Sequence, residues 1–233
     1  MGKAIIESLT KLVTIRVRWQ LRTATSRRLK TLEAAIRTSQ DEYERAGHYG
    51  MEHYQTVYNA GLFVMLLSYD LTIQRADQMQ EFNALRKNYY SRQLCLLVYE
   101  ALEDLPSVLG RGFRESLTAL FPEADAVTHL NKMTKQLATL RSTQGKYLNA
   151  LRGFAIAHRD HNAIKQALAI RVVDYVSIAQ IAGDLDLIIS ELVKWLTLVV
   201  QNMGNWRVIA NHMDFTKPPF RESSSNSNSS TSR

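Results

Sequence analysis

Apolar residues recur every three or four positions along most of the chain, a spacing that predicts amphipathic α-helices. The first predicted helical segment spans 3–45 and is either continuous or broken once, because the apolar spacing pauses over the basic stretch 22–30 and resumes at Leu32. We interpret that basic stretch as a solvent-exposed helix face, with an RNA-contacting arm as the alternative. Gly47 and Gly50 then indicate a turn.

Four further helices are predicted after this turn. The second spans about 52–82, the third about 84–109, the fourth about 124–158 and the fifth about 163–200. A short helix or turn over 113–121 separates the third from the fourth. No segment shows the strict alternation of apolar and polar residues that is typical of a strand. The predicted fold class is therefore all-α, an antiparallel bundle of four to five long helices.

The inward-facing positions of three helices follow from the same spacing. In the second helix they are Tyr54, Val57, Tyr58, Gly61, Leu62, Met65, Leu66 and Tyr69. In the third they are Leu94, Leu97, Val98, Leu102 and Leu105. In the fifth they are Ile178, Ile181, Leu185, Ile188, Leu192, Trp195 and Val199.

These helices are expected to form one domain over 1–215, with a core at about 52–200. The Ser/Asn-rich tail 216–233 has no apolar anchor and is expected to be disordered. The N-terminus lacks the apolar core of a signal peptide, and the apolar run 60–67 is too short to span a bilayer. We expect a soluble cytoplasmic protein with no membrane partner.

Composition adds two constraints to this picture. The chain carries 29 basic and 22 acidic residues, which permits a polyanionic partner wherever the cations share one face. The single cysteine, Cys95, excludes an intrachain disulfide and a thiolate zinc site. Because Cys95 lies in an apolar run, it is predicted to be a buried and unreactive thiol.

The end of the fourth helix is the best candidate for a functional site. Arg152 and His158 are followed at once by Arg159, Asp160 and His161. His158 falls beside the core-facing stripe, so a buried, hydrogen-bonded histidine is the alternative interpretation. On a straight helix Arg152 and His158 lie about 120° and about 9 Å apart. Joint action would need converging side chains, a helix distortion or a second copy of the chain.

Three arginines form a line along this helix. Arg141, Arg152 and Arg159 fall within about 20° of one another at 100° per residue. Gly145 lies on the same strip, where the missing side chain would let another helix come close. Two such strips meeting at a two-fold interface would form a positively charged groove suited to a phosphodiester.

Other chemistries are not supported by the motifs. The run from His158 to Asp160 spells the opening of a kinase catalytic loop, but Lys165 stands where the metal-binding Asn belongs and no glycine-rich phosphate loop occurs. His158, Asp160 and His161 crowd one helix end and would make a poor metal cage. The sequence therefore predicts no metal and no other cofactor.

The fourth helix of this predicted five-helix bundle carries Arg152 and, after five intervening residues, His158. This spacing resembles the Arg-x(4–6)-His signature of the HEPN superfamily. The surrounding Leu151-Arg152 and Ala157-His158-Arg159-Asp160 resemble the abortive-infection branch most. The resemblance is concentrated in about 135–200 and is moderately specific. The chain departs from the pattern at Gly153, where many active members carry a polar residue after the arginine.

The resemblance implies a metal-independent endoribonuclease that acts as a homodimer in defence or stress, with an antitoxin protein as a possible partner. His158 would act at the ribose 2′-hydroxyl or the leaving oxygen, and Arg152 would stabilise the phosphorane-like charge. Arg159, Asp160 and His161 would support them, and RNA would bind along Arg141, Arg152 and Arg159. The alternatives are a catalytically inactive HEPN bundle that binds RNA or protein, and a structural or adaptor bundle.

Overall fold

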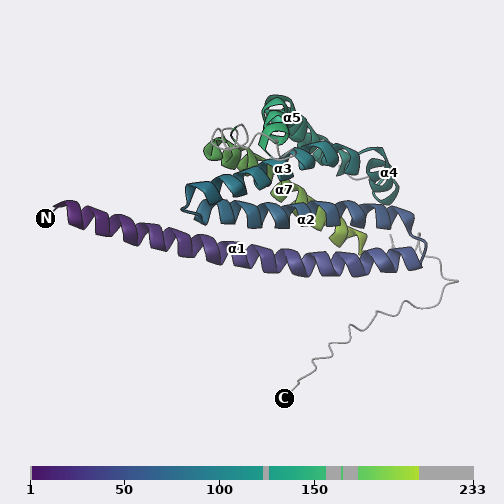
Figure 1. Cartoon of the computed structure of the whole chain (residues 1–233). Coiled ribbons are helices and arrows are strands. Elements are labelled where there is room, and N and C mark those ends of the chain that lie inside the picture. The colour runs from purple at the N-terminus through teal and green to yellow at the C-terminus, as the bar shows by residue number, and fades with distance from the viewer. Residues whose placement is uncertain (1, 123–125, 156–163, 165–172, 205–233) are drawn as a thin grey trace, which may run out of the picture.

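α-Helices joined by short connections build the described part of the protein. The computed structural model describes residues 2–122, 126–155, 164 and 173–204, which contain no strand. The helices are α1 (Gly2–His48), α2 (Glu52–Gln80), α3 (Ala84–Val108), α4 (Arg111–Leu120), α5 (Ala126–Ala155) and α7 (Tyr175–Met203), as Figure 1 shows. The all-α class predicted from the sequence is confirmed for these residues. The predicted tail 216–233 lies outside them.

α2 is the central helix of the bundle. It contacts α1, α3, α4 and α7, whereas α5 packs against α3, α4 and α7. α1 and α5 therefore lie on opposite sides, with α2 and α3 between them (Figure 1). α1 runs unbroken to His48 and its N-terminal part extends past the turn between α2 and α3 (Figure 1). Gly50, which follows α1, adopts φ 70, a conformation that favours glycine.

The core confirms most of the predicted inward positions. Every position predicted for the third and fifth helices is buried, apart from Leu97 and Ile188, which are partly buried and packed against the core. Four of the positions predicted in α2 are buried: Tyr54, Val57, Tyr58 and Gly61. Leu62, Met65 and Tyr69 are only partly buried, and the prediction fails at Leu66, which is 48 % exposed. There the buried face passes instead through Val64 and Leu67, because α1 and α7 both cover this helix and its contact surface is broader than one stripe.

The predicted fifth helix over 163–200 is not continuous, because Ile164 is helical but the chain leaves the helix before α7. Val173 and Asp174 are not helical, and α7 begins at Tyr175. Asp174 is the N-cap, because its side chain accepts hydrogen bonds from the Val176 backbone N–H (2.9 Å) and the Ser177 hydroxyl (2.6 Å). The same hydrogen bonds, with Ser177 the larger contributor, lower the pKa of Asp174. A capping aspartate inside an apolar pattern therefore marks the break.

Two other helix ends differ from the predictions by smaller amounts. α2 ends at Gln80, not at Phe82, and Asn83 caps α3 by accepting from the Leu85 and Arg86 backbone N–H groups. The third helix, predicted to end at about 109, ends at Val108, and Gly110 is the N-cap residue of α4. The predicted helix over 124–158 is described from Ala126 to Ala155.

α2 is also long and apolar enough to cross a membrane by length and composition alone. Half of its most apolar window is buried inside the bundle, and the core helix of a soluble protein meets the same criteria. This helix is therefore weak evidence for a membrane span.

Cys95 is fully buried in α3, as predicted, and its Sγ lies 3.9 Å from the Leu148 carbonyl oxygen of α5. Burial raises the pKa of this thiol to about 12. At pH 8 only about one thiol in ten thousand would be ionised. We expect a maleimide or disulfide reagent to leave the native protein unlabelled at pH 8 and to label it fully in denaturant. Mass spectrometry measures the labelled fraction, and rapid labelling of the native protein would contradict the predicted burial of this thiol.

Candidate functional site

Arg152 lies near the C-terminal end of α5 with its side chain exposed to solvent. Its guanidinium carbon stands 5.0 Å from the centre of the Tyr99 ring in α3, a cation–π contact. Leu148, one turn earlier, is fully buried and fixes this end of α5 against α3. No carboxylate among the described residues forms an ion pair with Arg152, so its positive charge is not offset there.

Arg141 lies on the same strip of α5, three turns before Arg152. Its Nε and Nη2 donate to the two carboxylate oxygens of Glu103 in α3, at 3.0 and 2.6 Å. Both side chains are exposed, so this ion pair contributes little stability. It does offset the charge of Arg141. A Cβ built on Gly145 would lie 3.9 Å from Cγ of Arg141 and within 4 Å of no other described side chain. No described helix of this chain therefore packs at that glycine.

The remaining predicted site residues lie outside the described residues. They are His158, Arg159, Asp160 and His161. The structure therefore places Arg141 and Arg152 along one edge of α5, where it faces α3, and leaves the approach of Arg152 to His158 as a prediction. The described part of α5 ends at Ala155, three residues before His158.

A buried ion cluster was not predicted from the sequence. The Asp186 carboxylate of α7 accepts hydrogen bonds from Arg28 of α1, at 2.6 and 3.1 Å, and from Arg75 of α2. Arg28 also donates to the Ser68 hydroxyl at 2.8 Å. The cluster joins three helices and carries two positive charges against one negative charge. The available signal was Asp186 itself, an acidic residue on the apolar face of α7, where a charge needs partners.

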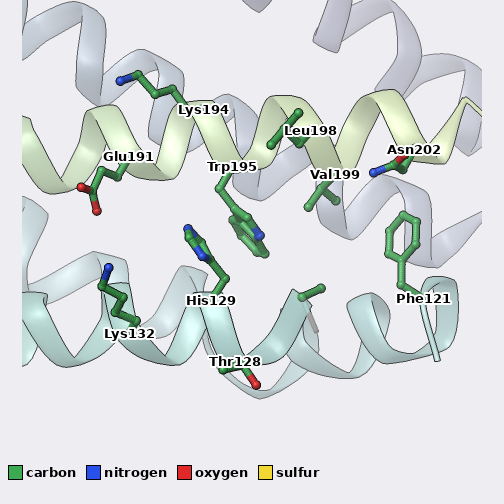
Figure 2. Close-up of a pocket in the computed structure, with 11 residues that line it drawn as sticks. Phe121, Thr128, His129, Lys132, Glu191, Lys194, Trp195, Leu198, Val199 and Asn202 are labelled. Atoms are coloured by element: carbon green, nitrogen blue, oxygen red, sulfur yellow. The ribbon is translucent and has the colours of Figure 1, made fainter. Parts of the chain in front are cut away.

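A pocket of about 780 Å³ opens between the first turns of α5 and the last turns of α7 (Figure 2). His129 stacks on Trp195 with ring centres 6.2 Å apart and an interplanar angle of 23°. Figure 2 shows the two rings meeting from opposite helices, with Lys132 and Glu191 beside them. His129 has no hydrogen-bond partner among the described residues, so nothing described orients it as a general base. This pocket lies about 35 Å along α5 from Arg152.

Neither the pocket nor the ion cluster is arranged to hold a metal. Within the described ranges no group of three or more His, Cys, Asp and Glu side chains could ligate one. Comparison of the chain with models of known protein families, with curated proteins and with solved structures found no match.

Proposed function

We propose that this chain is a HEPN-type, metal-independent endoribonuclease that acts as a homodimer in defence or stress. The observation that supports the proposal best is the position of Arg152. Its guanidinium is exposed, has no described carboxylate partner, and rests on Tyr99 where the Arg-x5-His run begins. RNA is the proposed substrate and an antitoxin protein a proposed partner.

The cation–π contact with Tyr99 suits a phosphate-binding role. The Tyr99 ring lies 5.0 Å from the guanidinium carbon and limits the positions that the side chain takes. No described carboxylate pairs with this guanidinium, so its N–H groups stay available to a phosphate. A fixed cation that loses little rotamer freedom on binding stabilises developing negative charge better than a mobile one.

The proposed reaction needs only the RNA and protein side chains. His158 accepts the proton of the ribose 2′-hydroxyl, and the 2′-oxygen attacks the adjacent phosphorus. The bond from phosphorus to the 5′-oxygen breaks, and the protonated His158 returns its proton to that oxygen, so the proton count balances. Arg152 stabilises the charge of the five-coordinate transition state, Arg141 and Arg159 bind flanking phosphates, and Asp160 and His161 support the imidazole. The products are a 2′,3′-cyclic phosphate and a 5′-hydroxyl.

Cleavage by the purified wild-type chain tests this proposal. With a single-stranded RNA and an excess of EDTA, we expect fragments ending in 2′,3′-cyclic phosphate, identified by mass spectrometry. The same sequence in 2′-O-methyl RNA lacks the attacking hydroxyl and should stay intact. Cleavage that EDTA abolishes, or cleavage of the 2′-O-methyl strand, would overturn the proposed chemistry.

Gly153 favours a second candidate function, a catalytically inactive HEPN bundle that binds RNA or protein. The residue is exposed, and a Cβ built there would meet nothing within 4 Å. It supplies no polar group at the position where many active family members carry one. RNA retention that weakens with salt, without any cleavage, would favour this binding function. Absence of both would favour a structural or adaptor bundle.

A further inference from the structure

We propose that the outward face of α1 is a second binding surface, one that takes the phosphate backbone and bases of single-stranded nucleic acid. The surface consists of Arg16, Trp19, Arg27 and Lys30, which we call the outer stripe. At 100° per residue these four positions fall within about 80° of one another, and they span about 21 Å of helix. The proposal is independent of the nuclease function.

The structure divides the basic residues between positions 16 and 30 of α1 into two groups. The first group, Arg18, Arg22 and Arg28, points toward the bundle and bonds to residues of other segments. Arg18 donates to the Gln80 carbonyl oxygen and covers the Phe82 ring, Arg22 donates to the Gln80 side chain, and Arg28 binds Asp186. The cations of the outer stripe are exposed and have no hydrogen bond or ion pair with any described residue.

No acidic residue in the described part of the chain forms an ion pair with the outer stripe. The sequence has no Asp or Glu between Glu7 and Glu33. Glu33 itself accepts a hydrogen bond from the Tyr69 hydroxyl at 3.0 Å, on the side of α1 that faces α2. The positive charges therefore share one face, which is the condition for attracting a polyanion.

Trp19 is the feature of the outer stripe that favours single-stranded nucleic acid over other polyanions. Its side chain is 67 % exposed, and it lies between Arg16 and Arg27 along the helix. An exposed aromatic ring among arginines offers a base a surface to stack on while the cations contact phosphates. A helix that lies in a membrane surface needs a continuous apolar face, and between residues 16 and 30 Trp19 is the one large apolar side chain in the 80° sector of the outer stripe.

The outer stripe is separate from the Arg152 site. α1 forms one side of the bundle and α5 the other (Figure 1). A strand bound to α1 therefore occupies a different surface from a strand at the end of α5.

Fluorescence anisotropy with an unstructured 20-nucleotide 2′-O-methyl RNA tests the outer stripe in the full chain. This probe lacks the 2′-hydroxyl nucleophile, so the result does not depend on cleavage. A plot of the logarithm of the association constant against the logarithm of salt concentration has a negative slope. The variant R16S/R27S/K30S should make that slope shallower by about 2, because it removes three phosphate contacts and each contributes about 0.7 on a single strand. Trp19→Ala should weaken binding about 5- to 150-fold.

A matched variant separates the outer stripe from net charge. R86S/R111S/K135S removes three exposed cations from α3, α4 and α5 and should keep the wild-type slope. An equal loss in both triple variants, or no loss in either, would overturn the proposal. So would loss of binding to phosphatidylserine vesicles with unchanged RNA binding, which would identify a membrane surface instead. Circular dichroism checks that each variant is folded.

Discussion

Replacing Asp186 with alanine is expected to lower the free energy of unfolding by about 3–5 kcal/mol. The Asp186 side chain is only 10 % exposed and is the one carboxylate among the described residues that binds the guanidinium groups of Arg28 and Arg75. Without it, two partly buried cations face each other with no counter-charge. For a chain of this size the loss corresponds to a melting temperature lower by about 6–20 °C.

Asp184→Ala is the matched control for this prediction. Asp184 lies two residues earlier in α7, has the same chemistry and is exposed. A change within about 0.5 kcal/mol is expected there. Urea unfolding followed by circular dichroism measures both variants. If Asp186→Ala were as stable as Asp184→Ala, the ion cluster would not be holding α1 to the bundle.

The fold was largely predictable because it depends on local patterns. Helix positions follow from apolar spacing, and the inward faces of α3 and α7 were predicted almost residue for residue. One failure occurs where a single polar side chain overrides the pattern, and another where tertiary packing decides which face of a helix is covered. Asp174 ends a run that is apolar on both sides, and nothing in the spacing distinguishes a capping aspartate from an exposed one. Leu66 depends on how many helices cover α2, which is a property of the tertiary packing.

The site was predictable only as residue types. The sequence identified Arg152 but gave no indication that Tyr99 would lie beneath it, because that contact joins two helices 53 positions apart in the chain. Likewise, the basic stretch of α1 was interpreted as a single solvent-exposed face, and its division into inner and outer arginines depends on Asp186 and Gln80. Long-range pairing of charges is set by how helices pack together, and composition alone does not reveal it.

Under the proposed nuclease function, alanine at Arg152 is expected to reduce kcat/KM for RNA by about 10²–10³, because a positioned cation at the developing charge is lost. His158→Ala should reduce it by about 10²–10⁴, since the 2′-hydroxyl loses its proton acceptor. Because both groups act on one transition state, the kcat/KM of the double variant should be only slightly lower than that of the less active single variant.

Three further variants separate the role of Arg152 from general charge. Arg152→Lys keeps the charge but loses the planar fork of donors, so it should recover only part of the activity. Tyr99→Phe keeps the ring beneath Arg152 and should cleave like the wild type. Arg141→Ala removes a cation that Glu103 already pairs, so its effect should stay below about tenfold. Wild-type cleavage by a folded Arg152→Ala variant would show that this guanidinium does not contact the reacting phosphate, and the nuclease proposal would lose its main support.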